Sequence, residues 1–138
     1  LVIEFFGPTD FYSAWTEEIF ADALDGSLRD LPGVSTMNAD IIQPLKSGTK
    51  TNAEVRLDLL RRSPVYFVDQ LPPTQGHHGM LDIVVPVSEA ELLRAAFIAE
   101  GLPSTDHALY TYPLGGHDAV TVLSGLERTR GFLNRLAQ

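Results

Sequence analysis

The pattern of apolar and polar positions along the chain predicts strands and helices in alternation. Residues 1–6 form an almost continuous apolar run of the length that a buried strand has. Residues 7–10, Gly-Pro-Thr-Asp, break this run, and apolar residues then recur at helical spacing over residues 15–24. A further helix is expected at residues 52–62, and it should end before Pro64 because the residue before a proline disfavours helical backbone.

The second part of the chain continues this alternation. A strand end and its loop are expected within residues 77–87, and another strand at residues 108–112 with a turn after it. Two Ser-x-x-Glu sequences, Ser88 to Glu91 and Ser124 to Glu127, have the pattern of capping boxes at the starts of helices. Gly101 is expected to end the first of these helices as its C′ residue.

Strands that alternate with helices of this length are typical of βαβ units. The fold class is therefore expected to be α/β, with a mostly parallel sheet covered by helices on both faces. Residues 31–51 carry prolines and glycines among polar side chains, including Pro44 and Gly48. This stretch is expected to form a loop or a lid-like excursion from the main core.

Length and charge narrow the class of protein. Residues 1–138, of which 44% are apolar, are long enough for one compact domain or part of one. The 18 acidic and 10 basic residues give a net charge of −8, which argues against nucleic acid as a partner because a phosphate backbone requires clustered Lys and Arg. No apolar run reaches the roughly 18 residues of a membrane span, and no Cys is present for a disulfide or a thiolate. These features leave the localisation open.

Two residues with complementary chemistry, Asp82 and His117, each follow a predicted strand. Loops that leave the carboxyl ends of parallel strands meet at one edge of the sheet, so residues far apart in the sequence can lie close together there. A carboxylate that accepts from one imidazole nitrogen fixes the tautomer and stabilises the imidazolium that forms when the other nitrogen takes a proton. The sequence therefore predicts a catalytic pair in which Asp82 orients the ring and His117 acts as the base.

Three motifs occur around this pair in a fixed order. They are Gly-Pro-Thr-Asp at residues 7–10, His-Gly-Met-Leu-Asp-Ile-Val-Val-Pro at residues 78–86, and Tyr-Pro-Leu-Gly-Gly-His-Asp at residues 112–118. In this order they resemble the C-terminal half of an α/β-hydrolase of the esterase, lipase and prolyl-oligopeptidase-like group. The resemblance spans nearly the whole chain.

The resemblance implies both a fold and a function. Residues 1–6, the segment near His77 and residues 108–112 would be the last three strands of the family fold. The family relationship would make the chain the C-terminal part of a serine hydrolase that cleaves a small-molecule carboxylic ester. Asp82 would be the triad acid and His117 the triad base, and no cofactor would be required.

One part of the family pattern has no counterpart in the sequence. No serine has the flanking glycines of the Gly-x-Ser-x-Gly nucleophile elbow, which in the family precedes the strand that residues 1–6 resemble. Because the chain opens directly on this strand without Met, it is expected to be cut from a longer protein. The nucleophile is expected on an upstream segment or on a partner. The chain alone is then expected to be a poor catalyst or none.

Two alternatives to this hypothesis stay open. His117 together with His77 or His78 could hold a catalytic zinc ion with Asp82, since two imidazoles and a carboxylate form such sites. The spacing matches no compact zinc signature, so no metal is expected. The chain could also be a non-catalytic α/β half-domain that forms homo-oligomers through the exposed edge of its first strand, residues 1–6.

Overall fold

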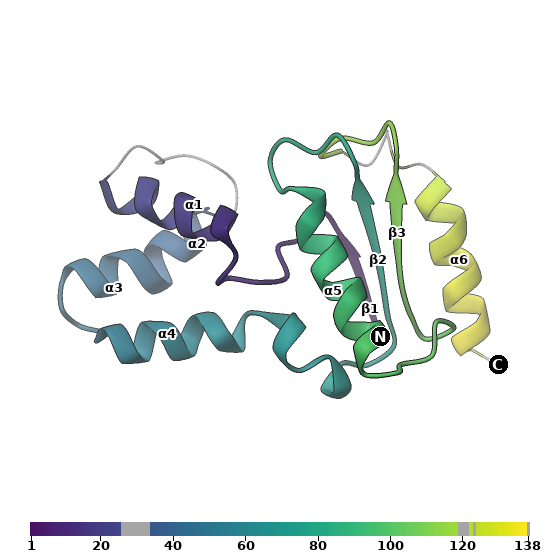
Figure 1. Cartoon of the computed structure of the whole chain (residues 1–138), viewed down its shortest axis with the longest axis horizontal. Coiled ribbons are helices and arrows are strands. Elements are labelled where there is room, and N and C mark those ends of the chain that lie inside the picture. The colour runs from purple at the N-terminus through teal and green to yellow at the C-terminus, as the bar shows by residue number, and fades with distance from the viewer. Residues whose placement is uncertain (26–33, 119–121, 123, 138) are drawn as a thin grey trace. The chain divides into compact units, whose positions relative to one another are not determined.

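The computed structural model describes residues 1–25, 34–118, 122 and 124–137 of the chain (Figure 1). The chain divides into two compact units. The sheet unit consists of Leu1–Thr9 and Pro64–Gln138, and the helical unit consists of Asp10–Ser63. No helix within the described ranges is both long enough and apolar enough to cross a bilayer.

The sheet unit is built on a sheet of three parallel strands, β1 (Val2–Phe5), β2 (Thr74–Gly79) and β3 (His107–Tyr112). The strand order is β1-β2-β3, and every residue of β2 pairs with a residue of β3. Parallel strands require crossover connections, and here these connections contain helices. The α/β class predicted from the alternating pattern is therefore confirmed, and the carboxyl ends of all three strands lie at one edge of the sheet.

Two helices cover opposite faces of this sheet, α5 (Val87–Ala99) and α6 (Ser124–Leu136) (Figure 1). Successive side chains of a strand point to opposite faces, and the contacts follow this alternation. On one face, Leu109 of β3 packs in a core cluster with Phe97 of α5. On the other face, the ring of His77 in β2 contacts α6, where the hydroxyl of Thr129 lies 3.2 Å from its Nε2 atom. Helices on both faces were predicted, and both are found.

The capping box predicted at Ser88 is wrong. α5 begins one residue before Ser88, and no side chain caps its first turn. The extended backbone of Pro86 sets this start, because the Glu89 amide already donates to the Pro86 carbonyl at 3.0 Å. α6 begins at Ser124, the residue before it lies outside the described residues, and the capping box expected there stays a prediction. By contrast, Gly101 has the left-handed φ of 65° expected of a C′ residue.

The helical unit contains α1 (Ala14–Asp25), α2 (Val34–Met37), a π-helical turn (Asn38–Ile42), α3 (Gln43–Lys46) and α4 (Asn52–Arg61). Its core is a cluster of Ile41, Val55 and Leu59, with further apolar side chains packed around them. α1 and α4 confirm the two helices predicted for this part of the chain. In α4, the helical spacing of Val55 and Leu59 brings both side chains to the buried face.

The loop expected within residues 31–51 is instead helical from residue 34 to residue 46. Pro44 has no amide proton to donate within this helical run, and the Asp40 carbonyl, four residues earlier, accepts from Lys50 Nζ at 2.8 Å instead. Gly48, with a φ of 71°, follows the end of this helical stretch. Residues 31–33 lie outside the described residues, and a lid-like role for this segment stays a prediction.

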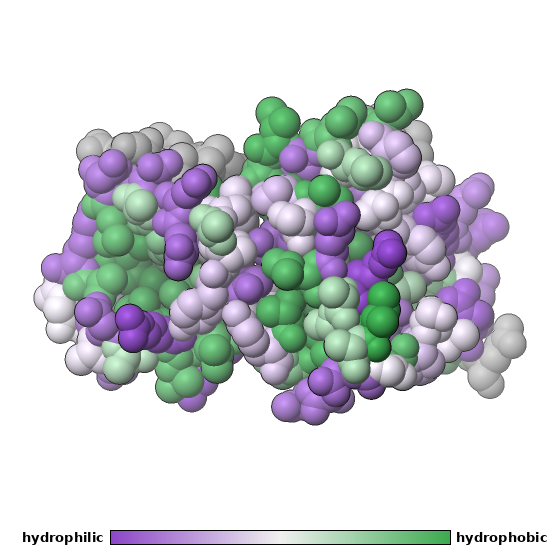
Figure 2. Space-filling view, in the orientation of Figure 1, coloured by the Kyte–Doolittle hydropathy of each residue, from purple (hydrophilic) through white to green (hydrophobic). Residues whose placement is uncertain are grey.

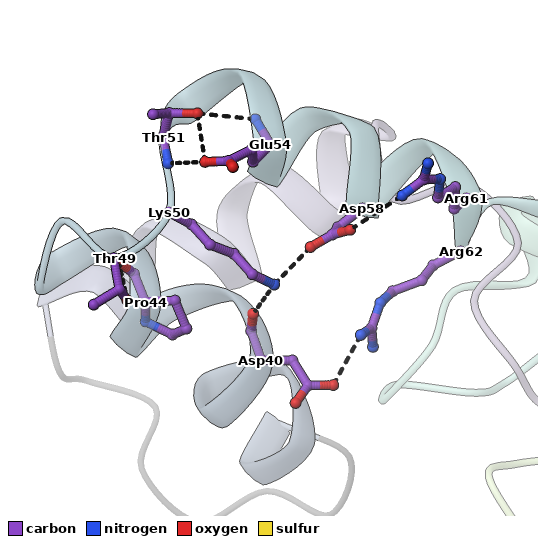
Figure 3. Close-up of polar contacts among 9 residues, drawn as sticks. All are labelled: Asp40, Pro44, Thr49, Lys50, Thr51, Glu54, Asp58, Arg61 and Arg62. Atoms are coloured by element: carbon purple, nitrogen blue, oxygen red, sulfur yellow. Dashed lines mark hydrogen bonds and ion pairs between the residues drawn. The ribbon is translucent and has the colours of Figure 1, made fainter.

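Charged side chains of the helical unit pair at its surface (Figure 3). At the start of α4, the Thr51 hydroxyl accepts from the Glu54 amide at 3.3 Å, and the Glu54 carboxylate accepts from the Thr51 amide at 2.7 Å. This capping box satisfies two amides that the first helical turn leaves without partners. Next to it, Lys50 Nζ lies 2.6 Å from the Asp58 carboxylate.

Candidate active site

The loops that follow β2 and β3 carry the two predicted site residues and are joined by backbone hydrogen bonds. The Met80 amide donates to the Tyr112 carbonyl at 2.9 Å. One residue further, the Leu81 amide donates to the Gly115 carbonyl at 2.8 Å. The loop with the predicted acid and the loop with the predicted base therefore leave the sheet side by side.

Asp82 and His117 are brought together by these loops. The Oδ2 atom of Asp82 lies 2.8 Å from the Nδ1 atom of His117. Its other oxygen, Oδ1, accepts from the amides of Val84 at 2.8 Å and Val85 at 2.9 Å. The side chain of Asp82 is fully buried, with an exposed fraction of 0%. Both carboxylate oxygens thus have fixed partners, and the carboxylate has little freedom to turn.

These partners hold Asp82 in its ionised form. Burial raises the pKa of this carboxyl group, because it removes water from the charge. The amides of residues 84 and 85 and the His117 ring oppose this effect and hold the pKa of Asp82 below the ordinary value for aspartate. An ionised carboxylate only accepts hydrogen bonds, so Nδ1 of His117 must donate and carry the proton. The other ring nitrogen, Nε2, is then able to take a proton.

His117 stands at the surface of the site and packs against Phe6. The His117 side chain is 37% exposed, and within the described ranges its Nε2 atom has no hydrogen-bond partner. The rings of Phe6 and His117 lie 5.2 Å apart between centroids. Phe6 is buried and has a φ of 62°, and no other described residue except glycine has a positive φ. Strained backbone of this kind persists where its surroundings impose it, and it is concentrated at functional sites.

No signal in the sequence predicts that Phe6 packs against His117 with a positive φ, because Phe does not favour the left-handed backbone region. The residue follows β1 directly, and its amide donates to the carbonyl of His77 at 3.1 Å. This hydrogen bond continues the pairing of β1 with β2 by one residue. The tertiary structure therefore places the Phe6 ring beside the imidazole.

His78 shapes the loop around the carboxylate. Its ring is fully buried, and Nε2 donates to the Val85 carbonyl at 2.8 Å. The same nitrogen lies 3.5 Å from Oδ2 of Asp82, which is at the limit of a hydrogen bond. His78 thus fastens the far end of the loop that carries Asp82.

His77 lies on the opposite face of the sheet and takes no part in the site. Its Nδ1 atom is 2.7 Å from the Tyr112 hydroxyl, and its Nε2 atom is 3.0 Å from Oε1 of Gln75. Burial, with a smaller contribution from the positive charge of Arg128, lowers the pKa of His77 to about 4. The ring is therefore neutral and forms part of a buried polar network under α6.

A metal site would require three of these side chains to converge. In the part of the chain that the structure describes, no group of three or more His, Asp or Glu side chains could hold a metal ion. His77 points away from Asp82 because adjacent strand residues face opposite sides. His78 directs its Nε2 atom to a backbone carbonyl. The geometry is that of a hydrogen-bonded acid and base.

The two loops that carry the acid and the base also carry exposed apolar side chains. Figure 2 shows apolar surface at the end of the sheet unit where these loops lie. The exposed apolar residues of the two loops are Met80, Leu81, Ile83, Val84 and Leu114. Their side chains are exposed by 44% to 97%, which is high for large apolar residues. Apart from Asp82, which is buried, the segment from Gly79 to Pro86 carries no carboxylate or basic Lys or Arg side chain.

We compared the chain with models of protein families, with curated proteins and with solved structures, and no significant match was found. The chemistry of the site is therefore inferred from its own residues. These are a buried carboxylate, an imidazole ordered by it, and an apolar surround.

Proposed function

We propose that this chain is the C-terminal part of a serine hydrolase that cleaves carboxylic esters. It supplies the acid, Asp82, and the base, His117, while the serine nucleophile comes from an upstream segment or a partner. The observation that carries this proposal is the 2.8 Å contact between a fully buried carboxylate and Nδ1 of a partly exposed imidazole. This arrangement leaves Nε2 available as a general base.

The reaction would proceed in two halves. In the first, the serine hydroxyl attacks the ester carbonyl carbon while Nε2 of His117 takes the hydroxyl proton, and Asp82 stabilises the resulting imidazolium. The tetrahedral intermediate then expels the alcohol, which receives this proton. In the second half, water attacks the acyl-enzyme in the same way, and the carboxylic acid and the free serine are released.

The three sequence motifs support this proposal. The acid lies in the His-Gly-Met-Leu-Asp-Ile-Val-Val-Pro stretch and the base in the Gly-Gly-His turn, in the order that α/β-hydrolases use. Three parallel strands with helices on both faces are compatible with the last three strands of that fold. Both residues also lie at the carboxyl edge of the strands, where ligands of open α/β sheets bind.

The edge of β1 supports a nucleophile supplied from outside the described residues. Within those residues β1 pairs only with β2, so the backbone groups on its other edge are unpaired. Leu1 and Val2 are exposed there by 54% and 39%. A parallel strand added at this edge would end at the same side of the sheet as Asp82 and His117. A serine in the turn after that strand could then reach Nε2.

The apolar side chains around the site favour an uncharged ester. Exposed side chains such as Ile83 and Leu114 would contact the acyl or alcohol group of a bound substrate. The segment from Gly79 to Pro86 offers no cationic group to neutralise a charged substrate. An ester is therefore preferred over a charged peptide.

A fluorophosphonate probe, which reacts with activated serines, tests the proposal. The protein that contains this chain should be isolated through a tag at the end of the chain and treated with the probe. We expect one labelled serine outside residues 1–138, and loss of labelling in His117→Ala. The matched control is His107→Ala, a histidine at the start of β3 that packs against Phe97 and not against the site. Unchanged labelling of His117→Ala, or a labelled serine within the chain, would contradict the proposal.

The unpaired edge of β1 also supports a second candidate function. A non-catalytic half-domain would satisfy this edge by pairing with a second copy of the chain. Sedimentation of the chain over a range of concentrations distinguishes the two. Dimers that dissociate when Ile3 is replaced by Pro would support the half-domain, because the amides of Val2 and Phe6 donate to the β2 side and the Ile3 amide between them faces the free edge. Monomers at all concentrations would remove it from consideration.

A further inference from the structure

Two glycines form the closest backbone contact between the loops of the candidate site. Gly79 is the last residue of β2, and Gly115 lies in the turn after β3, two residues before His117. Neither of them has a left-handed φ, in contrast to Gly48 and Gly101. Backbone conformation therefore does not explain why these two positions are glycines. The explanation is the space around them.

A side chain at either position would collide with the backbone of the other loop. A Cβ atom on Gly79 would lie 2.3 Å from the carbonyl oxygen of Gly115 and 2.5 Å from that of Gly116. A Cβ atom on Gly115 would lie 2.9 Å from the Cα atom of Gly79. Real Cβ atoms essentially never have neighbours under 3.0 Å, and backbone atoms cannot swing aside as a long side chain can. Only glycine allows the loops to approach this closely.

The same contact controls the positions of the acid and the base. The Gly115 carbonyl that a Cβ on Gly79 would strike is the carbonyl that accepts from the Leu81 amide at 2.8 Å. On the other side, the Asp82 amide donates to the Gly79 carbonyl at 3.3 Å, which makes a tight turn. Each glycine is therefore connected to one partner of the Asp82–His117 pair by a turn of two or three residues.

We propose that Gly79 and Gly115 are positioning residues, which set the distance between the Asp82 carboxylate and the His117 ring by letting the two loops cross in backbone contact. Their effect on catalysis rests on the proposed serine-hydrolase function. Their effect on the tautomer of His117 is a property of this chain alone.

The size of the effect follows from the contact distances. A Cβ on Gly79 must retreat by at least about 0.7 Å to reach 3.0 Å from the Gly115 oxygen. If the loops separate by this amount, the 2.8 Å contact between Asp82 and His117 stretches to about 3.5 Å, where a hydrogen bond is largely lost. A misplacement of about 1 Å can lower a catalytic rate on the order of 100-fold.

The distance between Asp82 and His117 can be tested by measuring which ring nitrogen of His117 carries the proton. In the ¹⁵N-labelled chain, at a pH where the ring is neutral, NMR of the imidazole nitrogens should show the proton on Nδ1. We expect Gly79→Ala and Gly115→Ala to shift it to Nε2, because the carboxylate no longer holds it. The matched control is Gly116→Ala, whose Cβ would meet, among the described residues, the Asp118 carboxylate at an ordinary 3.5 Å. This variant is even closer to His117 in sequence and should keep the Nδ1 proton.

The His77 ring serves as an internal control for folding. It lies on the other face of the sheet in contact with Tyr112, and its signals should stay unchanged in Gly79→Ala and Gly116→Ala. In Gly115→Ala, whose Cβ would lie 3.0 Å from the Cβ of Tyr112, the signals should shift slightly but stay those of a folded ring. An Nδ1 proton retained on His117 in both Gly79→Ala and Gly115→Ala would overturn the proposal, as would its loss in Gly116→Ala. If both Gly79→Ala and Gly115→Ala lose the His77 signals while Gly116→Ala folds, the crossing is needed for the whole sheet unit. That result would also overturn a positioning role.

The experiments distinguish a failure of the positioning role from a failure of the proposed serine-hydrolase function. If no serine reacts with the fluorophosphonate probe, the tautomer experiment still decides whether the glycines position the ring. If the enzyme is active, Gly79→Ala and Gly115→Ala should lower kcat on the order of 100-fold with little change in KM, whereas Gly116→Ala should have a far smaller effect.

Discussion

The sheet unit and the helical unit differ in where they keep their ionisable side chains. Within the described residues, the buried histidines and carboxylates are His77, His78, Asp82 and Glu89, all in the sheet unit. The buried polar side chains of the helical unit are the hydroxyls of Thr16 and Ser63, which donate to carbonyls close in sequence. Its carboxylates and bases pair at the surface (Figure 3).

This difference indicates where geometry is held most tightly. A buried ionisable group loses its hydration, so it is tolerated only when protein groups satisfy it in a fixed arrangement. Surface pairs keep much of their hydration and contribute little. We therefore expect changes in the buried groups of the sheet unit to have large and pH-dependent effects. Changes in the surface pairs of the helical unit should have small effects that depend on salt.

The largest effect is expected for Asp82→Ala. This change removes the acceptor of the part-buried Val84 amide and of the buried Val85 amide, which should lower the free energy of unfolding by about 1–3 kcal/mol. Urea unfolding followed by circular dichroism measures it. Asp82→Asn keeps one acceptor oxygen, so its free energy of unfolding should fall distinctly less than that of Asp82→Ala. Equal losses in the two variants would show that the amide contacts are not the cause.

The His77 network should make the sheet unit sensitive to acid. The pKa of His77 is about 4 in the folded state, against 6.5 for an ordinary histidine. Between these two pH values the ring is protonated in the unfolded chain and neutral in the folded protein. Stability should therefore fall as the pH falls from 6.5 to 4, by at most about 1.4 kcal/mol per pH unit. His77→Gln should flatten this slope in denaturant unfolding. A slope that persists in the variant must arise from other groups.

Glu4 should act in the opposite direction. Burial, opposed by the Gly7 amide, raises the pKa of Glu4 from 4.5 to about 7, so the folded state holds a proton that the unfolded state releases. Its contribution to stability is present below pH 4.5 and is lost as the pH rises through 7. Glu4→Gln keeps an oxygen acceptor for the Gly7 amide and should remove this dependence. The same unfolding titrations compare it directly with His77→Gln.

A moderate effect is expected at the capping box of the helical unit. Thr51→Ala removes the hydroxyl that caps the amide of Glu54 and should cost about 1 kcal/mol. Fluorescence of Trp15, the single tryptophan of the chain and part of α1, reports unfolding of this unit. Thr49→Ala, outside the helix cap, is the matched control and should lower the free energy of unfolding by less than Thr51→Ala does. A larger cost for the control would contradict the assignment of the cap.

The smallest effect is expected for the surface ion pairs. Lys50→Met removes the 2.6 Å contact with Asp58 and should lower the unfolding midpoint only slightly. The difference from the parent chain should shrink in high salt, because salt screens exposed charges. Arg61→Met, whose side chain is 68% exposed and 3.9 Å from Asp58, should leave the midpoint unchanged. A difference for Lys50→Met that salt does not reduce would show that packing is the cause.

The sequence predicted the elements of both units because local features define them. Apolar runs located β1 and β3, helical spacing located the helices α1, α4, α5 and α6, and the break before Pro64 was correct. For β2, only a strand end within residues 77–87 was expected, because its sequence, Thr-Gln-Gly-His-His-Gly, contains no apolar run. The errors occurred where tertiary contacts override local patterns. The stretch around Pro44 is helical because Ile41 and Ile42 are buried in the core, and the N-cap residue of α5 is Pro86 rather than a serine.

The candidate site was predictable only in part. Asp82 and His117 were expected to meet because parallel strands bring their loops to one edge, and they do lie in contact, although their catalytic roles stay a prediction. Phe6, Gly79 and Gly115 could not be identified in this way. Their roles depend on atoms that approach from distant parts of the chain, and no periodicity or spacing records such an approach.

The sequence by itself determined the alternation of strands and helices, the acidic charge, and the residue types available for acid and base chemistry. These properties follow from the order of residues and from local backbone preferences. Only the tertiary structure decided that His77 faces away from the site, and that Phe6 packs on the imidazole in a strained conformation. It also decided that two loops cross at Gly79 and Gly115. These features depend on distances between residues far apart in the chain, which are fixed only when the core is packed.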